Sequence, residues 1–536
     1  MMRRTASLLA MALTALAIGG CSLAPVYTPP ALPTPPSWPV GDAYLRQSEA
    51  ALPAVTYRDV FRDARLQSII DQALANNRDL RIAAANIASA RAQYRIQRAD
   101  LLPRLDANGR YNYSGGGNGT TSVAGNGGTG TGGTGTGGNG GTGTGGTGGT
   151  GGTGGTGGTG GTGGNGNGGS VISSGGGNGS AFSVNLGVTA FELDLFGRVR
   201  SLTGAALDRY FATEAAARAT RITLVGDIAD AWLTYAADAS LLRIAQDTAT
   251  SAAQSVRLTR QRLEGGIAPR TDLRQAEQVL ETANADLAQQ RTALAQDVNA
   301  LQLLVGAPVA PALLPGSIDE AQTSVATLPA GLDSRVLLRR PDVVQAEYEL
   351  RAANAEIGAA RAALFPRISL TGLLGFASNA LTSLFSGGAF NYSVSPQVSV
   401  PLFQGGAGVG GVEFSQAQRD LALATYERAI QAAFRETADA LARQGTFADQ
   451  LRANTNFRAA AQDTLNLTNL RYRGGIDTFL TSLDAQRAFY TAQRTLVQTQ
   501  LVGASNKVSL YRALGGDSLL VVTPDGPMPV TPGADR

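Results

Sequence analysis

The sequence predicts a mixed α and β membrane protein in which one structural unit occurs twice. Three observations predict this class. An N-terminal apolar segment ends at the single cysteine of the chain, as in the signal sequences of exported lipoproteins. Four short segments alternate apolar and polar residues, as membrane-spanning β-strands do. Two long stretches without proline suit very long helices, and matching motifs place strands and helices in the same order twice.

The composition excludes several classes of function. The 536 residues include 44 basic and 41 acidic side chains, no histidine and one cysteine. A catalytic triad with histidine, a zinc site of cysteines and histidines, and a disulfide within one chain are therefore impossible. The formal net charge of +3 is small and no basic run occurs, so we expect no nucleic-acid partner. We expect no enzyme, no metal site and no cofactor beyond a covalent lipid.

The first element is a predicted lipoprotein signal peptide, residues 1–20. Its apolar run is too short for a membrane-spanning helix, which needs about 20 apolar residues. Small residues followed by Cys21 resemble the bacterial lipoprotein cleavage site, so we expect Cys21 to carry the lipid; secretion with a free thiol is the alternative. By resemblance to lipoprotein sorting, Ser22 at the next position favours the outer membrane. Residues 21–56 then form the lipidated N-terminus and a proline-rich tether.

Two motif pairs reveal the internal repeat. Residues 97–105 match residues 360–368, and residues 262–267 match residues 471–476. The number of residues that separates the first pair differs from the number that separates the second pair, and the difference equals the extra length of one loop. This loop is rich in Gly, Thr and Asn and holds 37 of the 68 glycines of the chain. We expect this loop to be a flexible surface segment, because such a composition cannot build a core. The predicted first repeat is 57–305, the linker or equatorial segment is 306–333, the second repeat is 334–514, and the C-terminal tail is 515–536.

Each repeat is predicted to hold two amphipathic strands, four in the whole chain, and uninterrupted long helices. Residues 222, 225, 229, 232 and 236 follow a 3-4-3-4 apolar spacing, typical of a coiled-coil seam, and residues 423, 426, 430 and 433 repeat it. A helix folded back on itself is the alternative, but only two Gly-Gly pairs interrupt these runs. The predicted elements are strand 104–113, loop 114–180, strand 181–191 and helices 198–264 and 270–304 in the first repeat, and helix 334–364, strands 367–377 and 391–402 and helices 410–473 and 478–513 in the second.

The strands are incomplete on their own. Each has about 9–12 residues, the length of a tilted membrane-spanning strand. Four strands cannot close a barrel, and a sheet edge exposed to lipid leaves backbone groups unpaired, so several chains must contribute. One-sided strands of a soluble sandwich would show the same alternation. Pro396 also counts against the last strand, because proline removes a hydrogen bond between strands.

Further motifs carry a family resemblance. They are Ala24-Pro25-Val26-Tyr27, Asp194-Leu195-Phe196-Gly197-Arg198, Leu337-Leu338-Arg339-Arg340-Pro341-Asp342-Val343, Phe365-Pro366 and Pro401-Leu402-Phe403. With these the chain resembles the outer membrane factor family, the TolC-like channels of tripartite efflux pumps, and specifically their lipoprotein (NodT-type) branch. The resemblance implies a trimeric 12-stranded transmembrane β-barrel, four strands per chain, continuous with a long periplasmic α-helical coiled-coil tunnel. It also implies a location in the bacterial outer membrane, with the Gly-rich loop outside the cell.

The resemblance further implies partners and a function. The expected partners are two other copies in a homotrimer, a periplasmic adaptor, an inner-membrane pump of the RND type and outer-membrane lipid. Because no energy-converting motif is present, we expect a passive exit duct for small molecules such as drugs, toxic compounds or metal ions. Two alternatives remain open: a duct for type I protein secretion, and a non-transport lipoprotein scaffold that displays an adhesive Gly-rich loop.

Candidate site residues lie near the two Gly-Gly turns. Asp484 and Arg487 are three residues apart on one predicted helical face, with Leu480 one turn earlier. A local surface ion pair is the simplest interpretation; by resemblance these three residues form the periplasmic gate, with Thr271 and Asp272 as weaker counterparts in the first repeat. The turns predicted by resemblance to dock the adaptor are Gly265-Gly266-Ile267 and Gly474-Gly475-Ile476.

Overall fold

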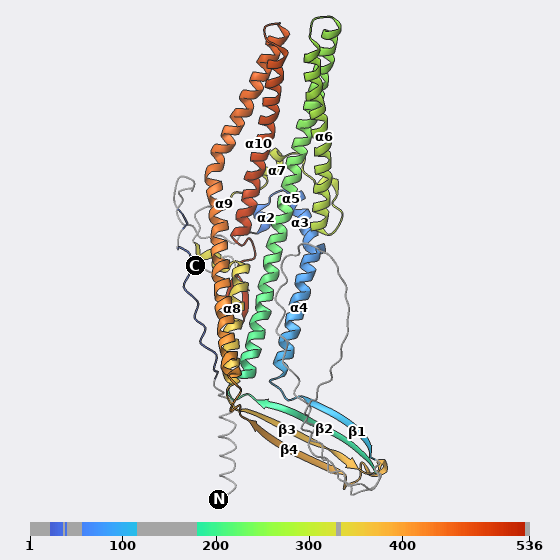
Figure 1. Ribbon diagram of the computed structural model, residues 1–536, viewed down its shortest axis with the longest axis vertical. Coiled ribbons are helices and arrows are strands. Elements are labelled where there is room, and N and C mark those ends of the chain that lie inside the picture. Colours follow the sequence, from blue (N-terminus) through green and yellow to red (C-terminus); the bar gives the residue numbers. More distant parts are fainter. Residues whose placement is uncertain (1–21, 36–37, 40–55, 115–178, 329–333, 531–536) are drawn as a thin grey trace, which may run out of the picture. The chain divides into compact units, whose positions relative to one another are not determined.

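The computed structural model describes residues 22–35, 38–39, 56–114, 179–328 and 334–530. The predicted signal peptide, Cys21, most of the Gly-rich loop and parts of the tether and linker lie outside the described residues. The chain divides into two units: a helical unit formed by residues 1–103, 192–369 and 398–536, and a strand unit formed by residues 104–191 and 370–397 (Figure 1). Each unit is described by itself.

Four long helices form the frame of the helical unit. Helices α5 (Arg198–Glu264) and α9 (Ala407–Arg473) each have 67 residues, or about 100 Å at the rise of an α-helix. Helix α6 (Arg270–Val305) packs along α5, and α10 (Phe479–Ala513) packs along α9, so that each repeat supplies one antiparallel hairpin (Figure 1). The helices are continuous over the proline-free stretches, as the sequence predicts.

The predicted coiled-coil seams are buried. In α5, Ile222, Val225, Ala229, Trp232 and Ala236 are each at most 5% exposed. In α9, Tyr426, Ile430 and Ala433 are buried and Leu423 is partly buried against them. The 3-4 spacing therefore identifies the faces by which α5 and α9 contact the rest of the unit.

One predicted helix differs from the structure. Residues 334–364 were expected to form a single helix, but Ser334–Arg339 is a 3-10 helix (η2) and the α-helix α8 covers only Pro341–Ala362. Arg340 between them is extended, with φ −65° and ψ 137°. The reason is Pro341: a proline disfavours the helical conformation at the preceding residue but is well suited to the first helical position.

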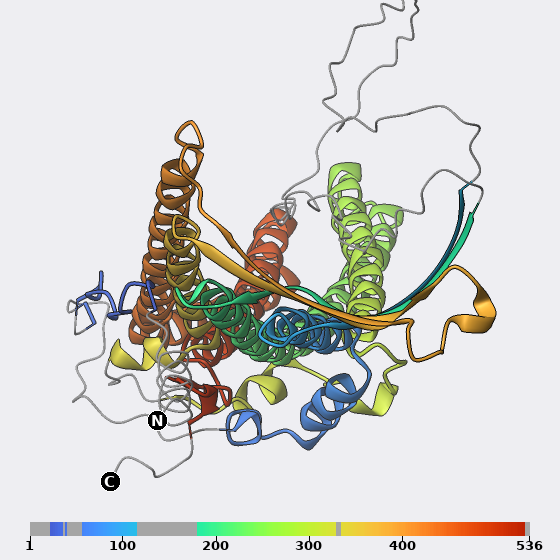
Figure 2. The same ribbon diagram turned by 90° about the horizontal axis from the view of Figure 1, so that it is seen from below.

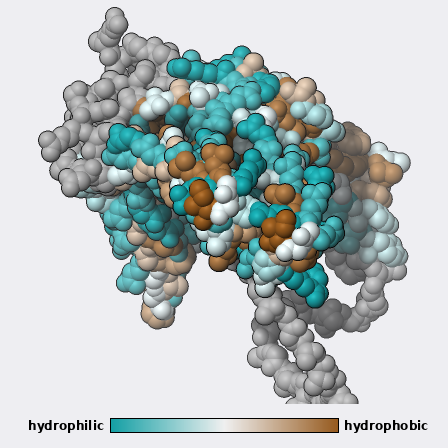
Figure 3. Space-filling view, turned by 90° about the horizontal axis from the view of Figure 1, so that it is seen from above, coloured by the Kyte–Doolittle hydropathy of each residue, from teal (hydrophilic) through white to brown (hydrophobic). Residues whose placement is uncertain are grey.

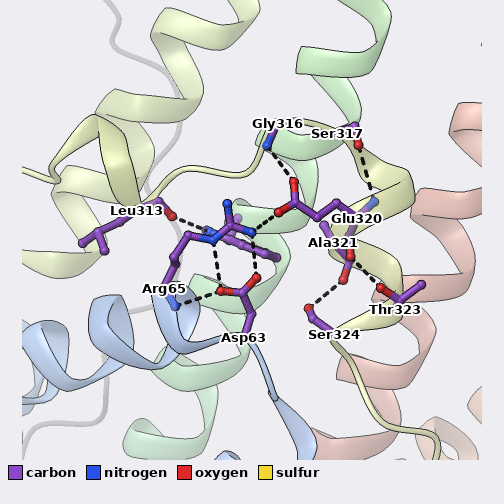
Figure 4. A network of polar contacts seen from close by, with 10 residues as sticks. Asp63, Arg65, Leu313, Gly316, Ser317, Glu320, Ala321, Thr323 and Ser324 are labelled. Carbon is purple, nitrogen blue, oxygen red and sulfur yellow. Dashed lines mark hydrogen bonds and ion pairs between the residues drawn. The ribbon is translucent and has the colours of Figure 1, made fainter.

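Short helices fill the middle of the helical unit, including the segment 306–333 predicted as a linker. Helices α2 (Tyr57–Val60), α3 (Ala64–Asn76), η1 (Pro311–Leu313) and α7 (Ile318–Thr323) lie along one side of the long helices (Figure 2). Arg65 is paired with Asp63 at 2.8 Å and with Glu320 at 2.5 Å, and its guanidinium lies over the ring of Trp232 (Figure 4). This network ties α3 to α7 and α5.

Part of the predicted C-terminal tail, 515–536, forms regular structure. Strands β5 (Leu520–Thr523) and β6 (Gly526–Pro529) form an antiparallel hairpin. The Tyr348 hydroxyl on α8 donates a 3.0 Å hydrogen bond to the carbonyl oxygen of Thr523. Leu520 is fully buried in a cluster with Phe211 and Tyr348. These strands have four residues each, too few for alternation to identify them.

The strand unit is one four-stranded sheet. Its strands are β1 (Leu105–Ser114), β2 (Gly179–Leu193), β3 (Arg367–Ser378) and β4 (Phe390–Ser399), in the spatial order β1-β2-β3-β4. In the register, Leu105 lies opposite Val188 and Tyr111 opposite Phe182, so the predicted apolar faces of β1 and β2 coincide. The strands curve together (Figure 2), and many of their large apolar side chains are exposed, among them Tyr111 at 59% and Val394 at 66%.

The fourth strand is shorter than predicted, and its proline is explained by its position. Strand β4 ends at Ser399, so Val400 and Leu402, expected within 391–402, lie outside it. Pro401 lacks the N–H that a continuing strand would need. Among the described residues β4 is an edge strand, with one neighbour in the sheet, which is where a proline such as Pro396 is tolerated.

Candidate functional site

The two Gly-Gly turns that join the long helices have the same local geometry. Gly266 and Gly475 adopt left-handed backbone conformations, with φ of +73° and +72°. The N–H of Ile267 donates to the carbonyl oxygen of Arg262 at 2.8 Å, and the N–H of Ile476 donates to that of Arg471 at 2.9 Å. This bond across six residues, with glycine in the left-handed position, is a Schellman motif, which reverses the chain and satisfies a free helix carbonyl.

The turns present exposed apolar side chains. Ile267 is 71% exposed and Ile476 is 67% exposed. The view onto this end of the helices shows separate hydrophobic patches surrounded by hydrophilic surface (Figure 3). Single exposed apolar side chains are common on protein surfaces, so what this exposure shows is that both side chains are accessible.

The surroundings of the two turns differ. In the second turn, Arg471 binds Asp477 through both ends of its guanidinium, at 2.7 and 2.9 Å. At the spacing of the repeat, the first turn has Arg262 but Ala268 in place of the aspartate. The Arg262 guanidinium lies instead over the ring of Tyr472, 4.8 Å from its centre. This cation–π contact connects the first hairpin to the second.

An apolar cluster next to the turns also joins the hairpins. Val256, Leu273 and Ala276 come from α5 and α6, and they pack against Tyr472 and Leu483 of α9 and α10. The Tyr472 side chain is buried, and its hydroxyl has no hydrogen-bond partner among the described residues. Arg262 and Tyr472 are not among the site residues predicted from the sequence. A comparison of the two repeats points to Tyr472, because its counterpart in the first repeat is Leu263 and the two copies differ at this position.

The three predicted gate residues lie at the start of α10. Asp484 and Arg487 form an ion pair of 3.4 Å on one helical face, with side chains 61% and 52% exposed. Leu480, one turn earlier, is 46% exposed. A pair this exposed contributes less than about 1 kcal/mol within one chain. The structure therefore brings the three residues together on an accessible surface, where groups of another chain are able to reach them.

The weaker counterparts in the first repeat, Thr271 and Asp272, lie in the first turn of α6. Thr271 is exposed and Asp272 is half-buried. The N–H of Asp272 donates to the carbonyl oxygen of Pro269 at 3.2 Å. A carboxylate in the first turn stabilises the positive end of the helix dipole, which is a sufficient structural reason for Asp272.

The N-terminal residues 22–27, here called the strap, lie along α8. Asn354 donates a 2.7 Å hydrogen bond to the carbonyl oxygen of Pro25, and Arg361 donates one of 3.3 Å to that of Leu23. The Tyr27 ring lies under the guanidinium of Arg351, 4.8 Å from its centre. Burial, followed by the nearby carboxylate of Glu347, raises the pKa of Tyr27. The residues that follow Cys21 are thus held beside the C-terminal half of α8, from which the chain continues into β3.

Two further results concern only the part of the chain that the structure describes. No group of three or more acidic or cysteine side chains there is arranged to hold a metal ion. None of the described helices combines enough length with enough apolar character to cross a membrane.

Comparison with known proteins gives a consistent picture. A family described as "Outer membrane efflux protein" matches residues 69–144, 152–307 and 332–516. The toluene efflux pump outer membrane protein TtgC of Pseudomonas putida is 40% identical over 516 residues, which is 96% of each chain. The outer membrane protein OprJ of Pseudomonas aeruginosa is 36% identical over 517 residues, 96% of this chain and 97% of its own.

Solved structures agree with these sequence relatives. The open state of the Neisseria gonorrhoeae outer membrane channel MtrE is similar with a TM-score of 0.74 and 31% identity, over 93% of this chain and 98% of its own. The CusC structures, which concern folding and transmembrane channel formation, are similar with a TM-score of 0.73 and 33% identity, over 92% of this chain and 100% of theirs.

Proposed function

The chain belongs to the outer membrane efflux protein family, and from this membership we propose that it is the outer-membrane exit channel of a tripartite efflux system. The channel is a trimer that works with a periplasmic adaptor and an inner-membrane pump. Three sheets of four strands close one twelve-stranded barrel, continuous with a helical tunnel in the periplasm. The channel itself is a passive duct for small molecules, and the pump supplies the energy for their export.

One observation carries this proposal: identity of 40% over 96% of the chain to outer-membrane components of efflux pumps. The geometry of the sheet supports it. Among the described residues, β1 and β4 each have one neighbouring strand, and in lipid an unpaired strand edge is unfavourable. Identical copies supply the missing neighbours. Since the curated relatives are efflux proteins, neither the secretion duct nor the adhesive scaffold is proposed.

The pump type and the lipid are finer parts of the proposal. We propose a pump of the RND type, and a lipid on Cys21 as the only covalent cofactor. The strap supports the lipid, because Leu23 is held beside Arg361 at the end of α8 that leads into β3. Mass spectrometry of the mature N-terminus, with Cys21→Ser as the control, tests this assignment.

We propose that Leu480, Asp484 and Arg487 form the periplasmic gate and that the two Gly-Gly turns dock the adaptor. The exposed pair of Asp484 and Arg487 supports the gate, because both side chains are accessible to groups of neighbouring chains. The exposed isoleucines of the turns support the docking role. In planar bilayers, a variant carrying Asp484→Ala and Arg487→Ala should conduct more than the wild-type channel at rest. Equal conductance would contradict the gate.

The channel function itself needs a separate test. In a bacterium that lacks its own efflux outer-membrane protein, the chain expressed with a matching pump and adaptor should restore resistance to the compounds the pump exports. The purified protein should migrate as a heat-sensitive trimer and conduct ions across a lipid bilayer. A protein that stays monomeric in detergent and never forms a conducting pore would refute the proposal.

A further inference from the structure

A polar layer separates two apolar contacts between the hairpins. Near the turns, the hairpins meet in the apolar cluster around Tyr472 and Leu483. Farther along, they meet in the main core around Trp232. Between these levels, Gln486 of α10 contacts Ser251 of α5 at 3.5 Å, and α10 is tied to α6 by the groups described next. Polar contacts exchange with water more readily than buried apolar ones.

Asp286 of α6 is the centre of this layer. Its carboxylate accepts a 2.7 Å hydrogen bond from the hydroxyl of Tyr490 and lies 3.8 Å from the guanidinium of Arg494, both on α10. The Arg494 guanidinium also lies over the Tyr490 ring, 5.4 Å from its centre. Burial and the hydrogen bond to Asp286 raise the pKa of Tyr490 to about 12, so its hydroxyl keeps the proton that it donates. We call Asp286, Tyr490 and Arg494 the latch.

The latch is not a remnant of the repeat. At the spacing that aligns the two Gly-Gly turns, the counterpart of Asp286 is Thr495, that of Tyr490 is Glu281 and that of Arg494 is Ala285. None of these counterparts reproduces the acid, the phenol or the cation at its position. The latch is therefore a specific contact between two unlike hairpins, one from each repeat.

The latch also adjoins the proposed gate. A cavity of about 360 Å³ between α5, α6 and α10 is lined by both Asp286 and Tyr490, and by Arg487. Arg487 is one helical turn from Tyr490 on α10. A movement of α10 away from α6 at the latch therefore displaces the helix segment that carries Asp484 and Arg487.

We propose that Asp286 is a positioning residue of the gate, which holds α10 against α6 in the closed channel and releases it when the channel opens. The inference rests on the proposed channel function and adds a residue outside the predicted gate. The contacts are partly exposed, with the Asp286 side chain at 22% and the Arg494 side chain at 38%. Ion pairs in such settings are weak enough to break and re-form reversibly.

Single-channel recording tests the latch. Asp286→Ala should raise the open fraction of the resting channel about fivefold, the effect of losing one contact of this kind. Asp286→Asn, which keeps an oxygen for the Tyr490 hydroxyl but loses the charge beside Arg494, should give a smaller rise. The matched control is Glu277→Ala, because Glu277 has a similarly buried side chain (26% exposed) and pairs with Arg260 and Arg274 inside the first hairpin. It should leave the open fraction unchanged.

A cross-link supplies the reverse test. Cysteines introduced at Ser251 and Gln486, bridged by a bifunctional thiosulfonate, should return the Asp286→Ala channel to the wild-type open fraction, and a reducing agent should reverse this. All variants are first checked for the heat-sensitive trimer, so that a loss of folding is not read as opening.

The outcomes separate the latch from the channel function. If Asp286→Ala conducts like the wild type while the Asp484 and Arg487 double variant opens the pore, the latch is wrong and the function stands. Equal opening by Asp286→Ala and Glu277→Ala would also overturn the latch, because the effect would then be unspecific. If no variant and no wild-type trimer conducts, the proposed function fails and the latch fails with it.

Discussion

Replacing Gly358 with alanine tests how closely the strap packs on α8. A Cβ at this position would lie 2.7 Å from the backbone nitrogen and Cα of Ala24. Helix propensity alone predicts that the substitution stabilises the helix by about 1 kcal/mol. The close approach of the strap predicts that the substitution destabilises the protein instead, because backbone atoms cannot move aside as a flexible side chain can.

The structure sets the size of the effect. To reach ordinary contact the strap must retreat by roughly 0.7 Å. That movement stretches the 2.7 Å hydrogen bond from Asn354 to the Pro25 carbonyl toward the limit of hydrogen-bond geometry. A lost hydrogen bond costs about 1 kcal/mol, and overpacking costs about 1–3 kcal/mol. After the gain in helix propensity, we expect Gly358→Ala to destabilise the docked strap by about 1–3 kcal/mol.

Limited proteolysis of the purified trimer measures strap release, and thermal melting measures stability. The Gly358→Ala protein should be cleaved faster within residues 22–27 and should melt at a lower temperature. The control is Gly204→Ala in α5, where no other part of the described chain lies within 4 Å of an added Cβ. This variant should melt at an equal or higher temperature. Unchanged cleavage together with a stabilised Gly358→Ala trimer would refute the close packing of the strap.

Two further predictions concern stability. Arg340 is 8% exposed, pairs with Asp342 and Glu436 and donates to the carbonyl oxygen of Ala513. In denaturant unfolding, Arg340→Ala should destabilise the helical unit by about 3 kcal/mol. A cost within about 0.5 kcal/mol, as at a surface position, would contradict the structural role of Arg340. Burial and then the neighbouring Asp238 raise the pKa of Asp297 to about 7. Between about pH 4 and 7 the folded state therefore holds a proton that the unfolded state has released, so the stability of the protein should fall as the pH rises through this range. Asp297→Asn should flatten the dependence of melting temperature on pH across that range. An equally steep dependence in Asp297→Asn would show that other groups cause it.

The elements that the sequence predicts well depend on local rules. The long helices lack proline and end at glycines, and the left-handed conformations of Gly266 and Gly475 follow directly from the Gly-Gly pairs. The strands follow from alternation, which the register of β1 and β2 preserves. By contrast, the strap on α8 and the short β5–β6 hairpin depend on contacts between residues hundreds of positions apart, such as Asn354 with Pro25, and no local pattern identifies such partners.

In the candidate site, too, the backbone of the turns follows from the local sequence, whereas the contacts of the surrounding side chains do not. This difference has a consequence for partner binding. Both turns share one backbone motif, because both repeats retain the Gly-Gly pair. The side chains around them have diverged: Asp477 closes the second turn onto Arg471, while Ala268 leaves Arg262 to contact Tyr472 of the other hairpin. An adaptor that meets both turns therefore meets two chemically different surfaces. The cation–π contact of Arg262 with Tyr472 joins the hairpins and has one partner beside each turn, so an adaptor docked as proposed would act on this contact from either side.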